Sequence, residues 1–319
     1  MLSGEQIGQL MDRIREQFAM AQDAEITMEV NPGTASAEKL RNFYTAGINR
    51  LSIGMQSAQA EELKNLGRIH DFEGFCQVYR EAVVAGFTNI NVDIMSGLPG
   101  QTLASYRDTL EKVLHLEPMP QHISAYSLIV EEGTPFAAMA ERGELPLPEE
   151  ETERAMYEET IEVLAKYGFH RYEISNYARD GYECRHNVGY WIRRDYLGFG
   201  IGAASLIDNV RFQNEKSLGT YLAHPLESRE EEQTLTVQDR MEETMFLGLR
   251  LTRGVSCVDF AEQYGRTVEE VYGEVIARNV ADGLLTVTER KENQKKDRFL
   301  ALTKRGLDLS NYVMAQFLF

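Results

Sequence analysis

Three short stretches decide the fold: ITMEVN at 26–31, LSIGMQ at 51–56 and NINVDI at 89–94. Apolar and polar residues alternate in each of them, which is the period of a β-strand with one apolar face. Sequence typical of a helix separates each stretch from the next, so the strands should pair in parallel. Parallel strands that are covered on both faces read as nearly continuous apolar runs, and these do not. We therefore expect their polar faces to line the solvated or ligand-filled interior of a curled sheet or partial barrel.

The segments between these strands repeat one pattern. The helix after the first strand should end at Gly47 and the helix before the third strand at Gly86, because glycine favours the left-handed conformation of a helix C-terminus. A further helix near 103–116 and a strand near 122–128 continue the array. Right-handed crossovers place the carboxyl ends of such strands on one rim. Three polar side chains should lie near that rim: Glu29, Gln56 and Asp93.

Composition divides the chain into three parts. The array of strands and helices should occupy 1–148, since a Pro-rich stretch at 145–148 precedes a new acidic helix. A middle segment, 149–235, contains a strand-like 172–174 and then an irregular part rich in Gly, Tyr, His and Arg. The last part, 236–319, has a different pattern. We therefore expect two soft boundaries and one separate C-terminal domain.

The C-terminal part has the element order of a winged-helix domain. Three helical stretches are followed by strands at 284–288 and 298–302, with a charged turn at 290–297 between them. The third helix, at 267–282, carries more acidic than basic residues, which would repel phosphate. We therefore expect no binding to nucleic acid in spite of the winged-helix order.

The net charge of the chain excludes some classes of binding partner. With 50 acidic and 33 basic side chains, the formal net charge of −17 opposes non-specific binding to nucleic acid or anionic membranes. No apolar run approaches the ~20 residues of a membrane span, and the first residues lack the features of a signal peptide, so we expect a cytoplasmic protein without stable membrane insertion. Cys76, Cys184 and Cys257 lie too far apart for a metal-binding or disulfide pattern, and Cys76 should be a buried, inert thiol on the apolar stripe of a helix.

A series of short motifs runs through the chain. They are EVNP at 29–32, RLSIGMQS at 50–57, NVDIMSGLPGQT at 91–102, SAYS at 124–127, EGTP at 132–135 and YEISNYA at 172–178. In this order, and over essentially 1–315, the chain resembles the radical S-adenosylmethionine (SAM) family of oxygen-independent coproporphyrinogen III oxidases. The resemblance implies an α/β fold, a partial (β/α) barrel of the radical-SAM type with a C-terminal winged-helix-like α+β domain.

The stretch RHNVGYW at 185–191 distinguishes two functions within that family. It resembles the HNxxYW motif of the HemW-type haem chaperones, which the true oxidases lack. The resemblance implies a protein that binds haem and transfers it to a haem-accepting protein. Two alternatives stay open: a coproporphyrinogen III oxidase or dehydrogenase of porphyrin biosynthesis, which would be a radical SAM oxidoreductase, and a cluster-free relic. Whether the chain is an enzyme stays open with them.

One part of the family pattern is absent from the sequence. Family members hold a [4Fe–4S] cluster on a CxxxCxxC loop after the first barrel strand, and a Gly-rich strand end follows; this sequence has neither. We therefore expect a barrel that is missing its first strands and a chain that does not assemble the cluster. A start inside a longer gene and a descendant that has lost the cluster both explain the pattern.

The resemblance also implies roles for single residues. Glu29, Gln56, Arg68 and Asp93 match the SAM-contacting positions of the family. Carboxylates at a strand rim can accept hydrogen bonds from a ribose diol or an ammonium group, and an arginine or glutamine can hold a carboxylate. The alternative is that Glu29 and Asp93 only cap neighbouring helix N-termini.

His186 is the candidate haem ligand. A neutral imidazole is a good axial ligand for haem iron, and Tyr190, Trp191 and Tyr196 could cover a porphyrin face. The alternative is a loop histidine that is hydrogen-bonded to the backbone. The glycines at 198–202 lack the strand-to-helix setting of a dinucleotide loop, so we expect them to serve close backbone packing.

Overall fold

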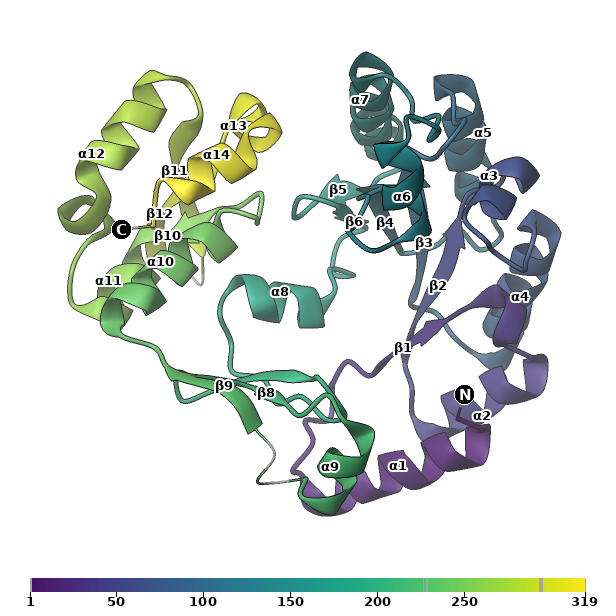
Figure 1. The fold of residues 1–319 in the computed structure, drawn as a ribbon. Coiled ribbons are helices and arrows are strands. Elements are labelled where there is room, and N and C mark those ends of the chain that lie inside the picture. Colours follow the sequence, from purple (N-terminus) through teal and green to yellow (C-terminus); the bar gives the residue numbers. More distant parts are fainter. Residues whose placement is uncertain (1, 226, 228, 293–294, 319) are drawn as a thin grey trace. The chain divides into compact units, whose positions relative to one another are not determined.

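The computed structural model describes residues 2–318 apart from 226, 228, 293 and 294 (Figure 1). The chain forms two compact units. The first unit comprises Met1–Arg171 and Ser175–Glu183, and the second comprises Tyr172–Ile174 and Cys184–Phe319. Among the described residues, no helix combines the length and apolar character that a membrane crossing requires.

The first unit is built on a six-stranded sheet with the order β1-β2-β3-β4-β6-β5. Its strands are β1 (Thr27–Val30), β2 (Arg50–Gln56), β3 (Ile90–Ser96), β4 (His122–Ser127), β5 (His170–Arg171) and β6 (Asn176–Ala178). Strands β1 to β4 pair in parallel, as expected, and β6 runs antiparallel to both β4 and β5. The sheet is open within the described part of the chain, so a partial barrel is confirmed.

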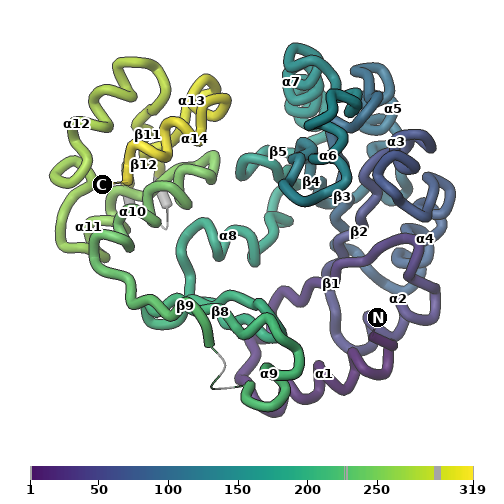
Figure 2. Tube along the Cα trace, viewed as in Figure 1, coloured from purple at the N-terminus to yellow at the C-terminus, as the bar shows by residue number. Residues whose placement is uncertain are grey.

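Helices precede, connect and follow the parallel strands, and Figure 2 shows the trace through them. They are α1 (Gly4–Gln17), α2 (Ala37–Ala46), α3 (Ala60–Asn65), α4 (Phe72–Ala85), α5 (Leu103–Leu114), α6 (Pro135–Glu141) and α7 (Glu150–Lys166), with a short 3-10 turn η1 (Pro32–Thr34). Gly47 (φ 97°) and Gly86 (φ 112°) end α2 and α4 in the left-handed conformation. Both predicted helix ends are confirmed.

The core of the first unit lies on the apolar face of the parallel strands. Leu51, Ile53 and Met55 of β2 are fully buried, and they belong to one cluster with Leu40 of α2 and Phe75 of α4. Because successive strand residues point to opposite faces, the polar residues between them lie on the face turned away from these helices. The predicted polar interior face is therefore present. Cys76 packs at the edge of the same cluster, and burial raises the pKa of its thiol, as expected of an inert cysteine.

The prediction of a strand at 172–174 was wrong. The strands lie on either side of it, and the backbone of this segment pairs within the second unit instead. The amide of Thr252 donates to the carbonyl of Tyr172, and Glu173 forms an isolated antiparallel bridge with Leu251. The apolar pattern that suggested a strand reflects burial, since Tyr172 and Glu173 are both buried.

The middle segment has more regular structure than its composition indicated. It contains α8 (Arg185–Trp191), α9 (Leu218–Ala223) and an antiparallel sheet of β7 (Ala204–Ile207), β8 (Val210–Asn214) and β9 (Arg229–Thr234). Asp208 and Asn209 join β7 to β8, and both have positive φ angles, as a tight two-residue hairpin turn requires. That Asp-Asn pair was the available sequence signal for the hairpin.

The C-terminal part has the expected winged-helix-like order. Its elements are α10 (Val237–Gly248), β10 (Val255–Ser256), α11 (Cys257–Tyr264), α12 (Val268–Ala281), β11 (Leu285–Glu292), β12 (Lys295–Leu302), α13 (Lys304–Asp308) and α14 (Ser310–Ala315). The charged turn predicted at 290–297 was wrong, because both strands extend into it and Arg290 pairs with Asp297. Opposite charges across the strands replace apolar alternation there. Residues 293–294 lie outside the described residues.

Candidate functional site

The polar face of the parallel strands carries a hydrogen-bond network centred on Asp93 and Asn91. Asn91 Nδ2 donates to Asp93 Oδ1 (2.7 Å) and to Ser52 Oγ (2.7 Å), and Ser52 Oγ donates to Asp93 Oδ2 (3.2 Å). Ser124 Oγ donates to Asn91 Oδ1 (3.1 Å), and His122 Nδ1 lies 2.6 Å from the same oxygen. These side chains occupy alternate positions of β2, β3 and β4, so the strand period puts them on one face and the parallel pairing brings them together.

Asp93 is a partly buried carboxyl in this network. Burial raises the pKa of Asp93, hydrogen bonds from Asn91, Ser124 and Ser52 oppose that shift, and the negative charge of Glu29 adds to it. The alternative that Glu29 and Asp93 merely cap helices was wrong. The helix caps in this region are Ser36, Asp71 and Thr102.

Gln56 ends β2 in an unusual backbone conformation. Its φ angle is 68°, and the ladder between β2 and β3 is irregular between Gly54 and Gln56. A Cβ at Gly54 would lie 2.9 Å from Gln56 Nε2, so glycine is needed for this close approach. The buried Gln56 side chain accepts a hydrogen bond from the Tyr126 hydroxyl (3.1 Å).

Tyr126 of β4 is the residue that sequence reasoning missed. Burial raises its pKa to about 12, with a further contribution from the charge of Asp93, while Arg68 opposes the shift. The pKa of this hydroxyl is affected by all four residues matched to SAM contacts, which are Glu29, Gln56, Arg68 and Asp93. Its position two residues after Ser124 on an alternating strand was the signal that could have found it.

Arg68 lies between α3 and α4, where it lines an open cavity of about 400 Å³ together with Lys64 and His70. His70 is buried, with Nε2 3.3 Å from the carbonyl oxygen of Met55. Burial lowers the pKa of His70, and the neighbouring Arg68 charge lowers it further. This side of the site carries the basic Lys64 and Arg68 together with one carboxylate, Asp71, in contrast to the acidic pair Glu29 and Asp93.

A buried carboxylate braces the loop that follows β3. Glu62 Oε2 accepts from Ser57 Oγ (2.6 Å) and Gln101 Nε2 (3.0 Å), and Glu62 Oε1 accepts from Ser105 Oγ (2.6 Å). Gln101 also donates to the carbonyl of Met95 and accepts from the amide of Leu98. These bonds hold the loop in place at the carboxyl end of the strand.

The cysteines do not fit an iron–sulfur cluster. Cys76 lies on α4 in the first unit, whereas Cys184 and Cys257 precede or begin α8 and α11 in the second. Throughout the described residues, no group of three or more His, Cys, Asp or Glu side chains is arranged to hold a metal ion.

His186 lies on α8, so the alternative was wrong in placing it in a loop. The exposed imidazole meets the ring of Tyr190 edge-on (centroids 4.7 Å apart, 83°), and Tyr190 meets Tyr196 in the same way (4.6 Å, 74°). His186 and Tyr190 are four residues apart, which places them on one face of α8. We call these three residues the ring ladder.

Trp191 lies apart from the ring ladder. Its ring stacks under the guanidinium of Arg250 (4.3 Å), and it lines a cavity of about 380 Å³ with Phe260 and Phe299. The structure thus brings Tyr190 and Tyr196 to His186, and Trp191 packs against α10 and α11 instead. Gly198 serves close packing as expected, because a Cβ there would lie 2.3 Å from the carbonyl oxygen of Ala204.

Comparisons with known proteins agree with these features. The Radical SAM superfamily profile matches residues 3–113, and the profile of the HemN C-terminal domain matches residues 235–309. The "Heme chaperone HemW" of Bacillus subtilis is 38% identical over 99% of this chain and 82% of its own length. The proteins of that name from Lactococcus lactis and Escherichia coli are each 35% identical, over 99% and 90% of this chain and 81% and 75% of their own lengths.

A solved structure supports the fold assignment. Coproporphyrinogen III oxidase (HemN) from Escherichia coli, described as a radical SAM enzyme, superposes with a TM-score of 0.79 at 25% identity. The match covers 99% of this chain and 74% of that one. Both units of the chain therefore have counterparts in one known protein.

Proposed function

We propose that this chain, which belongs to the HemW family of radical SAM proteins, binds haem and delivers it to an acceptor protein. The observation that carries the proposal is the exposed His186 on α8, with the Tyr190 and Tyr196 rings beside it. A neutral imidazole ligates haem iron well, and flat aromatic side chains can pack against the edge or face of a porphyrin. An exposed ligand suits a carrier, because haem must leave it again.

Two of the other histidines are less suited to this role. His70 and His122 are buried, and burial lowers the pKa of each. Haem could reach either imidazole only if the surrounding structure opened.

The polar face of the first unit is the proposed site for SAM. Glu29 and Asp93 offer carboxylates to an ammonium group and a ribose diol, while Arg68 and Gln56 suit a carboxylate. Gly54 lies beside both kinds of group, because a Cβ there would lie 2.9 Å from Gln56 Nε2 and 4.0 Å from Asp93 Oδ2. Because the cysteines do not fit a cluster, we expect weak SAM binding by this chain alone.

The likeness to HemN favours a second candidate, oxidation of coproporphyrinogen III. It has less support, because the curated relatives with the higher identities carry the name of haem chaperones. Incubation of the chain with coproporphyrinogen III, SAM and a chemical reductant tests this candidate. Formation of protoporphyrinogen IX would favour the oxidase.

Hemin titration followed in the Soret band tests the haem proposal. We expect His186→Ala to weaken hemin binding at least about tenfold and to shift the Soret maximum, because the axial nitrogen is lost. His170→Ala and His224→Ala are matched controls on other exposed or half-exposed histidines, and they should bind like the parent. If His186→Ala binds like the parent and His170→Ala does not, the axial assignment is wrong.

A further inference from the structure

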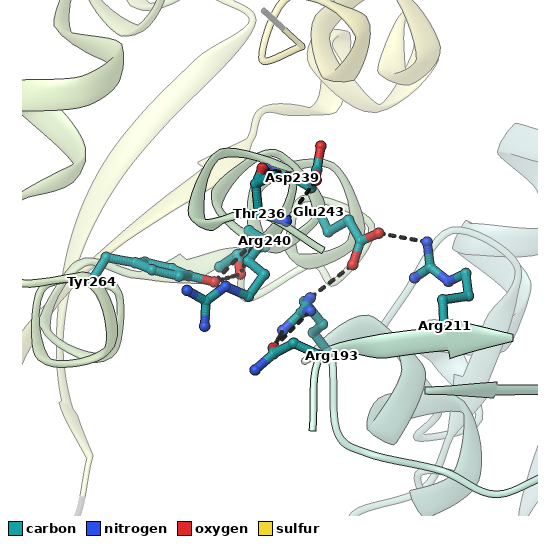
Figure 3. Close-up of polar contacts among 9 residues, drawn as sticks. Arg193, Arg211, Thr236, Asp239, Arg240, Glu243 and Tyr264 are labelled. Carbon is teal, nitrogen blue, oxygen red and sulfur yellow. Dashed lines mark hydrogen bonds and ion pairs between the residues drawn. The ribbon is translucent and has the colours of Figure 1, made fainter. Parts of the chain in front are cut away.

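A buried carboxylate joins three elements of the second unit (Figure 3). Arg193 Nε lies 2.7 Å from Glu243 Oε2, and Arg211 Nη1 lies 2.6 Å from Glu243 Oε1. The side chains of Arg193 and Glu243 are only 5% and 7% exposed. Charge-assisted bonds of this length are strong where water is excluded. We call these three residues the arginine clamp.

The clamp fixes the end of α8. Arg193 follows the C-cap residue Ile192 with a φ angle of 56°, and its amide donates to the carbonyl of Tyr190. Its guanidinium also donates twice to Asn209 Oδ1 (3.1 Å each) in the turn between β7 and β8. A left-handed conformation is unfavourable for arginine and persists only where the surroundings hold it. The clamp is what holds it here.

Arg211 also lies near Tyr196, because both residues pair with Leu206. Arg211 is directly opposite Leu206 in the ladder of β7 and β8, and Leu206 exchanges two backbone hydrogen bonds of 2.9 Å with Tyr196. The backbone therefore brings Tyr196 and Arg211 to the same residue. Burial lowers the pKa of Arg211, Glu243 raises it, and the nearby Tyr196 adds to the rise. A guanidinium that Glu243 holds beside Tyr196 restrains the orientation of the tyrosine ring.

Tyr196 is also the last member of the ring ladder. Glu243 contacts Arg211, Arg211 and Tyr196 lie on either side of Leu206, and ring contacts lead from Tyr196 through Tyr190 to His186. Edge-on aromatic pairs depend on orientation, so a ring that is held at one end restrains the next ring. This series of neighbouring residues begins at Glu243 and ends at His186.

We propose that Arg211, held by Glu243, positions His186 for its ligand. Arg211 is thus a positioning residue, and α10, the first helix of the C-terminal domain, is part of the haem site through Glu243. The inference rests on the proposed function, because it concerns the histidine that would bind haem. It adds that the orientation of the imidazole depends on an ion pair distant from it in sequence.

Two substitutions in the full chain test whether Arg211 positions His186 through the ring ladder. Arg211→Gln removes the link from Glu243 to Tyr196 and leaves the Arg193–Glu243 pair in place. Tyr196→Phe keeps the ring and removes only the hydroxyl. We expect roughly tenfold weaker hemin binding for Arg211→Gln, a smaller loss for Tyr196→Phe, and a shift of the Soret maximum in the same direction for both. Arg211→Lys keeps the charge and should recover part of the parent spectrum.

Arg298→Gln is the matched control. It breaks an ion pair with Glu269 of 2.9 Å in the same unit, and neither partner belongs to the clamp or the ring ladder. This variant should give the parent affinity and spectrum. A general loss of stability would change the hemin affinity of the control and of the test variants alike. A positioning role would change the affinity and the Soret maximum of the test variants only.

The outcomes separate the two proposals. If His186→Ala loses hemin binding while Arg211→Gln and Tyr196→Phe keep the parent affinity and Soret maximum, the positioning role is overturned and the haem site stands. If His186→Ala binds hemin like the parent, both proposals fail at this site. If circular dichroism shows that Arg211→Gln is unfolded, Tyr196→Phe alone decides, and a parent-like spectrum overturns the inference.

Discussion

The polar face of the first unit and the clamp region of the second are both networks of buried polar groups, but they are built differently. On the polar face, Ser52, Asn91 and Asp93 stand at alternate positions of neighbouring strands. In the clamp, Arg193 and Glu243 are 50 positions apart and come from the end of one helix and the middle of another. Alternation within each strand puts the residues of the first network on one face, and the pairing of neighbouring strands joins them. Packing of a helix end, a helix and a hairpin produces the second network.

The two networks also differ in how they balance charge. No described residue forms an ion pair with Asp93, which is held by neutral donors, and burial raises its pKa. Glu243 is held by two arginines. Burying a carboxylate is unfavourable unless charged partners compensate for the lost water. We therefore expect removal of the carboxylate charge to have opposite effects on stability in the two regions.

The largest effect should come from Glu243→Gln. It leaves two arginines without their carboxylate partner, one of them buried, so we expect the free energy of unfolding to fall by about 3–5 kcal/mol. Glu159→Gln is the control in the first unit, where Arg107 is half exposed, and it should change stability by less than about 1 kcal/mol. Urea unfolding measures both. Equal losses would show that the clamp is no stronger than a surface pair.

Gly198→Ala should have the next largest effect. The new Cβ would lie 2.3 Å from a backbone oxygen of Ala204, which cannot move alone, so we expect a loss of about 1–3 kcal/mol. Gly219→Ala in α9 is the matched control, because no atom lies within 4 Å of the added Cβ. This control should be neutral or slightly stabilising. A parent-like melting temperature for Gly198→Ala would contradict the packing role of this glycine.

Asp93→Asn should stabilise the protein by about 1 kcal/mol at pH 7. Because the pKa of Asp93 is raised in the folded state, the folded protein binds this proton more tightly than the unfolded chain does. The stability contributed by the protonated carboxyl is present below the ordinary aspartate pKa and is lost as the pH rises through the raised value. The gain from Asn should therefore be seen near neutrality and disappear below about pH 4.

Denaturant unfolding at several pH values checks this prediction. Glu29→Gln provides the control, since Glu29 is exposed and should contribute little at any pH. A loss of stability for Asp93→Asn at pH 7 would mean that the hydrogen bonds to the carboxylate outweigh its burial. The contrast between the two networks would then disappear.

Local chemistry in the sequence determined the parallel strands and the ends of their helices. Alternation located β2 and β3 to within one or two residues, and Gly47 and Gly86 marked the helix ends, because strand period and glycine conformation act over a few residues. The same alternation placed Asp93 and Gln56 on one face. The motif at 185–191 singled out His186, although not the helix on which it lies.

Only the tertiary structure decided which distant groups meet. Tyr126 joins the candidate SAM residues because β4 pairs beside β3. Segment 172–174 does not form a strand between β5 and β6, because its backbone bonds to residues 251 and 252 in the second unit. Glu243 meets Arg193 and Arg211 through the packing of α10, the end of α8 and a hairpin. The local sequence around these residues does not predict which residues they contact. The contacts follow from burial and charge pairing across the whole unit, and these forces depend on distance in space and not on distance in sequence.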